Sequence, residues 1–157
     1  EEPSAGRLVA ALVEAFPETF DDRHRLRGVE VKFFKKAQLV VGELHHRFRA
    51  EDPRFDFADA GALTAYVDNV VCAMAVMEGA VVLEPPLAAK IEAGEPLPSG
   101  SEEEVALRAA ALRACEEAAA ALGIHACEVG NFLWGVHGKK PSHRAFPRHA
   151  TPDTVFY

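Results

Sequence analysis

An aspartate embedded in an apolar run is the residue of this sequence best suited to chemistry. Asp68 stands among Leu, Tyr, Val, Cys and Met residues between positions 63 and 74. A carboxylate in such surroundings is costly unless it is paired or hydrogen-bonded. The same surroundings suit a carboxylate that acts as a general base or stabilises a developing positive charge. Asp68 is therefore either a catalytic carboxylate or a structural one that pairs with a cation or a helix terminus.

Two lysines are the first candidates for holding an anion. Lys35 and Lys36 directly follow two phenylalanines. A lysine beside aromatic rings can bind a phosphate while a ring stacks on a base. The alternative is a basic patch in contact with solvent.

Further basic residues lie in the second half of the chain. Arg108 follows Glu104 by four residues, and Glu104 follows Ser101 by three. This spacing fits a capping box followed by an ion pair on one helix face, which is the plainer reading of the two charges. His143 and Arg144 can reach an anion if the aromatic end of the chain docks onto the rest.

The patterns for metal binding and for nucleophilic catalysis are weak. Cys115, His125 and Cys127 match no usual zinc spacing, and His45 and His46 are adjacent, so they point in different directions on a helix. The sequence contains neither a Gly-x-Ser-x-Gly elbow nor a glycine-rich phosphate loop. We therefore expect no metal site and no cofactor.

The elements that must position these residues are predicted to be helices. Helical periodicity and a high alanine content predict an all-α fold of five to six helices, over 5–16, 31–48, 59–77, 85–93, 101–122 and 124–136. Strand signals are almost absent. Asp68 then lies inside a helix that is apolar on most sides and therefore central in the domain. Trp134, the single tryptophan, is expected to pack in the core.

Composition limits the classes of protein to consider. The 157 residues, 49% hydrophobic and 26% charged, fit one helical domain over 1–157, with 139–157 as an ordered or semi-ordered basic and aromatic tail. A formal net charge of −7 argues against general nucleic-acid binding. The longest apolar stretch, 70–83, is too short to span a membrane. Three cysteines fit a reducing, intracellular compartment, and a start at Glu1 fits a processed form or a fragment.

Stretches spread through the chain resemble the queuosine salvage proteins. The segment VKFFKKAQ at 31–38 resembles the family's FYKRAQ helix, LTAYVD at 63–68 its TMFADYRVPQ segment, GSEEEVALR at 100–108 its EVEIR segment, and FLW at 132–134 its YLW. ALVEAFP at 11–17, the pair at 143–144 and TVFY at 154–157 add to the match. The order and spacing of these stretches carry the resemblance.

The resemblance implies a fold, an activity and a site. The family is all-helical, similar to part of a helix-hairpin-helix DNA glycosylase, and acts as a queuosine 5′-phosphate N-glycosylase. It hydrolyses the bond between ribose and the 7-deazaguanine base and releases queuine for tRNA queuosine salvage. By resemblance Asp68 stabilises the positive charge on the sugar or activates water, Lys35 binds the nucleotide or its phosphate, and Tyr66 lines the pocket. Four further residues complete the implied substrate-binding set: Arg108, His143, Arg144 and Tyr157.

The chain also departs from the family pattern. The family chain is longer and the match covers its C-terminal part, so a partner chain or a missing N-terminal half is expected to cover the truncated side. Val70 stands where the family has an arginine, and Gly130 stands where it has a second aspartate. Losing a fixed cation and a carboxylate argues for weak or no activity.

Two functions therefore stay open. The first is a divergent N-glycosylase, which predicts that Asp68 is buried beside a cavity with Lys35 near it. The second is a catalytically degenerate relative that serves as a structural subunit of a larger assembly, which predicts a filled pocket with Val70 and Val71 packed into it. The resemblance implies a cytoplasmic location, or an organelle if a transit peptide has been removed.

Overall fold

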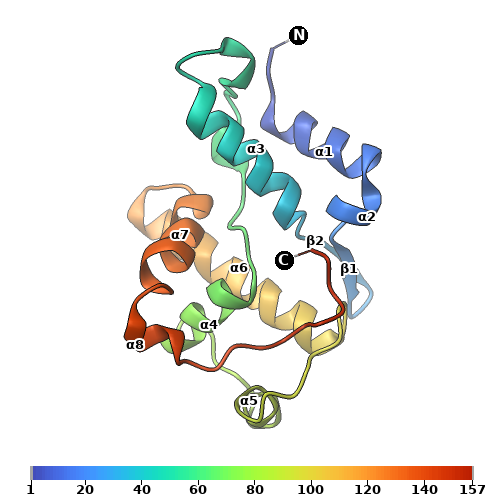
Figure 1. Cartoon of the computed structure of the whole chain (residues 1–157), viewed down its shortest axis with the longest axis vertical. Helices are drawn as coiled ribbons and strands as arrows, with labels where there is room; N and C mark the ends of the chain where they lie inside the picture. Colours follow the sequence, from blue (N-terminus) through green and yellow to red (C-terminus); the bar gives the residue numbers. More distant parts are fainter. Residues whose placement is uncertain (1, 157) are drawn as a thin grey trace.

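The N-terminal helix is held at its start from two directions. A computed structural model describes residues 2–156, in which α1 (Ala5–Ala15) leads through α2 (Pro17–Phe20) to the next elements (Figure 1). The Ser4 hydroxyl accepts a hydrogen bond from the Arg7 amide, as a helix N-cap does. The helix predicted over 5–16 is confirmed, and Pro17 stands at the first position of α2.

Asp59 provides the second support of α1, from far along the chain. Its carboxylate accepts hydrogen bonds from the Ser4 hydroxyl at 2.7 Å and from the amides of Ala5 and Gly6 at 2.6 and 3.1 Å. These hydrogen bonds lower the pKa of Asp59 to about 2. Asp59 therefore caps a helix that begins 54 residues earlier in the chain.

A short β-hairpin follows, which the sequence did not predict. Strands β1 (Arg23–Leu26) and β2 (Val29–Lys32) pair antiparallel, with Arg23 opposite Lys32. The two turn residues, Arg27 and Gly28, both have positive φ, at 49° and 84°. Such turns are usually marked by Asn-Gly or Asp-Gly, so Arg-Gly gave no signal. The helix predicted from 31 begins later, as α3 (Lys35–Phe48).

The prediction of one helix over 59–77 is wrong. The helical turns η1 (Pro53–Phe55) and η2 (Ala60–Ala62) precede a segment, 63–68, that has no regular secondary structure. Helix α4 (Asn69–Met77) starts only after it. Figure 1 shows this segment running down the middle of the molecule, between α3 and α6. Most of its side chains are buried, and a short apolar run looks the same in a buried extended segment as in a buried helix.

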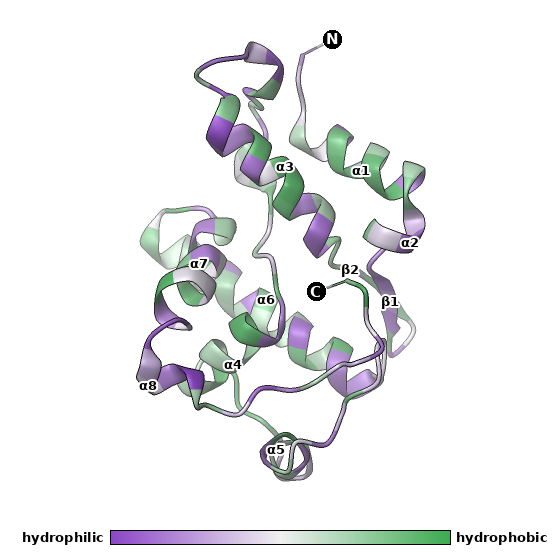
Figure 2. Ribbon diagram, viewed as in Figure 1, coloured by the Kyte–Doolittle hydropathy of each residue, from purple (hydrophilic) through white to green (hydrophobic). Residues whose placement is uncertain are grey.

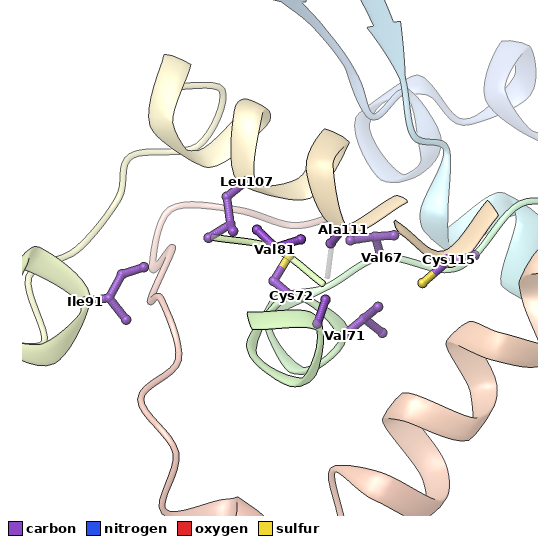
Figure 3. Close-up of a cluster of buried hydrophobic side chains, with 10 residues drawn as sticks. Val67, Val71, Cys72, Val81, Ile91, Leu107, Ala111 and Cys115 are labelled. Atoms are coloured by element: carbon purple, nitrogen blue, oxygen red, sulfur yellow. The ribbon is translucent and has the colours of Figure 1, made fainter. Parts of the chain in front are cut away.

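The C-terminal half packs three helices around one core. Helices α4, α5 (Pro85–Glu92) and α6 (Glu102–Leu122) contribute Cys72, Ile91, Leu107 and Ala111 to one buried cluster, which also includes Val67 of the central segment (Figure 3). The helices predicted over 85–93 and 101–122 are confirmed, and the fold is mostly helical as expected.

The expected capping box of α6 forms only in part. The Ser101 hydroxyl accepts a hydrogen bond from the Glu104 amide at 3.3 Å. One oxygen of the Glu104 carboxylate accepts a hydrogen bond from the Gly100 amide at 3.2 Å, and the other accepts one from Arg108. This box is therefore linked directly to a buried arginine.

The final elements form a wall on one side of the central segment. The helix predicted over 124–136 is divided into α7 (Ala126–Phe132) and a π-helical turn, η3 (Leu133–His137), and α8 (Pro141–Arg144) follows. Trp134 is 45% exposed, so the expectation that it packs in the core is wrong. Gly138 makes this wall close-fitting, because a Cβ there would lie 2.6 Å from the Val70 side chain.

The last segment of the chain is tied back onto the body of the molecule. Ala150 pairs with Pro96 in a parallel bridge, and the Ala150 carbonyl accepts a hydrogen bond from the Leu97 amide at 2.8 Å. The Lys36 ammonium donates to the Val155 carbonyl at 2.8 Å. Figure 1 shows this segment crossing from α8 toward the hairpin. Figure 2 shows polar and apolar residues interspersed along α3, in which Ala37, Gln38 and Val41 are buried. Within residues 2–156, no helix combines the length and apolar character needed to cross a bilayer.

Candidate active site

A small cavity lies where α3, the central segment and the α7–η3 wall meet. Its volume is about 160 Å³. Eight residues line it: Lys35, Leu39, Glu43, Tyr66, Asp68, Gly130, Asn131 and Trp134. The structure thus brings Lys35, Tyr66 and Asp68 of the predicted site to one place, although Lys35 and Asp68 are 33 residues apart in the sequence.

Helix α3 supplies one side of the cavity through a regular spacing. Lys35, Leu39 and Glu43 follow one another at intervals of four residues, and residues four apart lie on the same face of a helix. The Lys35 ammonium lies 3.6 Å from Oδ2 of Asp68, and the two side chains are 13% and 8% exposed. Lys36 faces elsewhere, toward the carbonyl of Val155. Only the first lysine of the predicted pair therefore contributes to this cavity.

Asp68 occupies the N-cap of α4 rather than the interior of a helix. Its Oδ1 accepts hydrogen bonds from the amides of Val70 at 2.9 Å and Val71 at 3.0 Å. Free amides and the helix dipole favour a negative charge at this end of a helix. The other oxygen, Oδ2, faces Lys35. One carboxylate oxygen thus caps the helix while the other faces the lysine, and the catalytic role of Asp68 stays a prediction.

Tyr66 forms the floor of the cavity and is fitted closely against α3. It is 7% exposed, and a Cβ at Gly42 would lie 2.0 Å from its hydroxyl oxygen. The glycine is therefore needed for Tyr66 to lie where it does. Burial, with smaller effects from Cys127 and Glu43, raises the pKa of Tyr66 well above its usual range. The phenol consequently keeps its proton at neutral pH.

The α7–η3 wall closes the opposite side. A Cβ at Gly130 would lie 3.0 Å from the Cβ of Ala65, so the absence of a side chain lets α7 approach the central segment closely. Trp134 stands on the π-helical turn, with the Lys139 ammonium 4.3 Å from the centre of its ring. The wall therefore offers an aromatic surface and an amide, Asn131, but no carboxylate at position 130.

Arg108 lies in a different environment from the cavity. Its guanidinium contacts both oxygens of Asp22, at 2.5 and 3.0 Å, and Oε1 of Glu104 at 3.2 Å. The Phe33 ring packs under it at 3.9 Å. Arg108 is fully buried and is not among the residues that line the cavity. Its predicted role in substrate binding stays a prediction.

Two of the predicted residues of the tail, His143 and Arg144, are not among the residues that line the cavity. A ring nitrogen of His143 lies 3.0 Å from the His137 carbonyl, and Arg144 donates to the Lys139 carbonyl at 3.1 Å. Tyr157 lies outside the described residues. The site roles of these three residues stay predictions.

A larger cavity lies on the far side of α4 and is a weaker candidate for catalysis. It measures about 350 Å³, and its walls are mostly aliphatic, with Cys72 and His149 among them. Burial raises the pKa of the Cys72 thiol far above its usual range and lowers the pKa of His149 to about 4. Both groups are therefore neutral near pH 7, whereas the smaller cavity holds a lysine and two carboxylates. Within residues 2–156, no group of three or more His, Cys, Asp or Glu side chains is placed to hold a metal ion.

Sequence reasoning missed several residues of the smaller cavity. The i, i+4, i+8 spacing from Lys35 could have identified Leu39 and Glu43. Trp134 could not be identified in this way, because its exposure depends on the switch from α7 to a π-helical turn. Asn131 carried no signal.

Comparisons with known proteins find relatives that are named for queuosine. A family model described as queuosine salvage protein matches residues 1–157. A protein of Sphaerobacter thermophilus, named queuosine 5′-phosphate N-glycosylase/hydrolase, is 36% identical over 163 residues, which cover 98% of this chain and 49% of that protein. A mouse protein of the same name is 29% identical over 105 residues, 67% of this chain and 30% of its own length. The chain thus matches about half of the length of the first relative and a smaller share of the second.

Proposed function

The chain belongs to the queuosine salvage protein family, and from this we propose that it hydrolyses the N-glycosidic bond of queuosine 5′-phosphate at the Asp68 cavity. The products would be queuine and ribose 5-phosphate. The observation that supports this most directly is the state of Asp68: a buried carboxylate, fixed by two amides through one oxygen, with the other oxygen beside a lysine and a cavity.

The chemistry suits a carboxylate held in this way. As the bond between the anomeric carbon and the base nitrogen breaks, positive charge develops on the sugar. Oδ2 of Asp68 stabilises that charge or takes a proton from the attacking water. The water oxygen bonds to the anomeric carbon, and its proton ends on the departing base. Because the α4 amides already hold Oδ1, the carboxylate needs little reorganisation during the reaction.

Lys35 has the position to hold the anionic part of the nucleotide. Its ammonium lies 3.6 Å from Asp68 and its side chain is 13% exposed, so it reaches both the carboxylate and the cavity opening. A lysine binds phosphate as a compact point charge. The proposal therefore gives Lys35 the 5′-phosphate or the neighbouring ribose, and gives Asp68 the anomeric centre.

Residues beyond this chain would complete the nucleotide site. Cavities that enclose a drug-sized ligand measure ~300–1,000 Å³, whereas this one measures about 160 Å³. We therefore include in the proposal a partner chain, or sequence beyond these residues, that walls the remainder of the substrate. The free cysteines are in keeping with action in a reducing, intracellular compartment.

A catalytically degenerate scaffold is the second candidate, and two residues favour it. Position 130, which lines the cavity, is a glycine instead of an aspartate. Val70 packs against the η3 turn near Gly138, where an arginine would present a charge. In this reading the chain keeps the helical framework of the family and serves as a subunit of an assembly.

The deciding experiment compares release of queuine by the parent chain and by Asp68→Asn. Purified protein is incubated with queuosine 5′-phosphate, and free queuine is measured by mass spectrometry. Asparagine caps helices as well as aspartate does, so this variant removes the charge and retains the cap of α4. We expect release to fall at least ~100-fold, the size of effect seen when one transition-state contact is lost. Equal release by both proteins contradicts the assignment of Asp68. No release by a folded protein that also carries the partner chain or flanking sequence supports the scaffold.

Lys35→Met provides the second test, with Lys36→Met as its matched control. The two lysines are neighbours at the start of α3, but only Lys35 lines the cavity. We expect Lys35→Met to raise KM for the nucleotide ~10-fold or more, because a charged hydrogen-bonding partner of the phosphate is lost, and Lys36→Met to leave it unchanged. Equal effects of the two substitutions would show a general basic patch instead of a site.

A further inference from the structure

We infer that Glu43 and Trp134 form a base-reading subsite, in which a guanine-type base stacks on Trp134 and presents its N–H edge to the Glu43 carboxylate. This inference rests on the proposed function, since it places the base of the same substrate. It is carried by a lysine and a glutamate that stand eight residues apart on the cavity-lining face of α3, and by a partly exposed tryptophan ring that lines the same cavity.

The two charged residues of α3 that line the cavity are separated by about two helical turns. Lys35 and Glu43 are eight residues apart, which corresponds to about 12 Å along a helix axis. Lys35 and Asp68 mark the end assigned to the sugar. Leu39 lies between the two charged residues on the same helix face. A substrate laid along this face with its sugar at Asp68 therefore carries its base toward Glu43.

A carboxylate matches the edge of a guanine-type base. Such a base, whether a purine or a 7-deazapurine, carries a ring N–H beside an exocyclic amine, and these two parallel donors fit the two oxygens of one carboxylate. Arg47 Nε donates to Oε2 of Glu43 at 2.8 Å from the side of solvent, and this ion pair limits the rotamers of the carboxylate. Glu43 lines the same cavity as Tyr66. An adenine-type base lacks the ring N–H, and its amine donates from a different position.

Trp134 provides the aromatic surface that a planar base requires. It is 45% exposed although it lines the cavity. It stands on a π-helical turn, a rare geometry that occurs frequently at functional sites. The Lys139 ammonium over the ring, 4.3 Å from its centre, limits the movement of the indole. Stacking of a base on such a ring is sequence-tolerant, so Trp134 supplies affinity and Glu43 supplies the choice of base.

Trp134 is also the single tryptophan of the chain, so its fluorescence reports directly on this subsite. We would titrate the protein with 7-deazaguanine, 7-deazahypoxanthine and 7-deazaadenine, which are free bases without a glycosidic bond and therefore bind without turnover. We expect quenching by all three bases, with affinity in that order. The series removes first the exocyclic amine and then the ring N–H from the edge that faces Glu43.

Glu43→Gln tests the role of the carboxylate. An amide cannot accept two hydrogen bonds in the way that a carboxylate does. We expect 7-deazaguanine to bind ~10- to 100-fold more weakly, and 7-deazaadenine to bind as before. The matched control is Glu117→Gln, since Glu117 forms an exposed i,i+4 pair with Arg113 far from the cavity. Trp134→Ala, followed by calorimetry, is expected to weaken all three bases to a similar extent.

The outcomes separate this inference from the proposed function. Preference for 7-deazaguanine that disappears in Glu43→Gln supports the inference, even if the parent chain releases no queuine. The inference is overturned if the folded protein shows no fluorescence change with any base, or if the preference survives in Glu43→Gln. In either case, Asp68-dependent release of queuine would leave the proposed function standing.

Discussion

Two clusters of opposite charges border the central segment 63–68, and they are built differently. In the first, Arg108 is enclosed by Asp22 and Glu104 with contacts of 2.5 to 3.2 Å, and these side chains are at most 1% exposed. It also donates to the carbonyl of Val67 at 3.4 Å. In the second, Lys35 and Asp68 are 3.6 Å apart, with side chains 13% and 8% exposed, and both line a cavity.

The difference shows how one set of residue types can serve structure in one place and chemistry in another. The carboxylates around Arg108 direct their oxygens at the guanidinium, at His24 and at the Gly100 amide. Although burial raises the pKa of Asp22, hydrogen bonds from His24 and Arg108 lower it below its usual range. The Arg108 cluster is thus closed. Asp68 directs one oxygen inward and leaves the other beside the cavity, so the Lys35–Asp68 pair is open to a ligand.

The largest effect should come from breaking the closed cluster with Arg108→Met. The substitution leaves Asp22 and Glu104 buried without their cation, and breaking a buried pair in this way costs about 3–5 kcal/mol. We expect the free energy of unfolding, measured in urea, to fall by that amount. Arg113→Met is the control on the same helix, because Arg113 is exposed and paired only at the surface. Equal stability of the two variants would show that the closed cluster has no structural role.

A second, somewhat smaller effect should appear when the pH is lowered, through the buried His149. Burial, and then the charge of Arg108, lowers the pKa of His149 from 6.5 to about 4. Cys72 and Glu92 line the same cavity. Because the unfolded state takes up this proton first, the contribution of neutral His149 is complete above pH 6.5 and is lost as the pH falls toward 4. The loss amounts to about 3 kcal/mol.

The measurement for His149 is a set of urea unfolding curves between pH 7.5 and pH 4, for the parent chain and for His149→Gln. We expect the free energy of unfolding of the parent to fall more steeply below pH 6.5 than that of the variant. Asp59 and Asp22 do not obscure this window, since their pKa values are lowered and their contributions are lost only at more acidic pH. Parallel curves for the two proteins would refute the prediction.

The smallest effect should come from the open side, through Gly42→Ala. The new Cβ would lie 2.0 Å from the Tyr66 hydroxyl oxygen, so Tyr66 must shift. We expect a loss of about 1–3 kcal/mol in the free energy of unfolding, as for other overpacked sites, together with weaker base binding. Adding Tyr66→Phe should recover part of the loss, because the ring carbon is then the nearest atom, at 3.1 Å.

Gly135→Ala is the matched control for Gly42→Ala, since nothing lies within 4 Å of a Cβ at that position. It should leave the melting temperature unchanged or raise it slightly. A neutral Gly42→Ala would mean that the cavity floor is adaptable, and the contrast between a closed and an open cluster would then rest on the ion pairs alone.

Local signals accounted for much of the fold. Ser101 caps the helix that it was predicted to begin, and Ser4 caps the helix predicted from residue 5. Pro17 and the prolines at 85–86 stand where helices start. Such features are readable because the hydrogen bonds involved join residues two to four positions apart. The hairpin and the segment 63–68 were not readable, since the turn had unusual residues and the apolar run fitted both a helix and an extended chain.

The amino-acid sequence by itself determined the family, the ends of most helices and the identity of Lys35, Tyr66 and Asp68 as a candidate group. Only the tertiary structure decided that Asp59 caps α1, that Arg108 is enclosed instead of facing the cavity, and that Trp134 stands at the surface. The physical reason is that these outcomes depend on partners distant in sequence. Which oxygen of Asp68 binds an amide and which faces a lysine is likewise fixed by α3, which meets the start of α4 only in the folded chain.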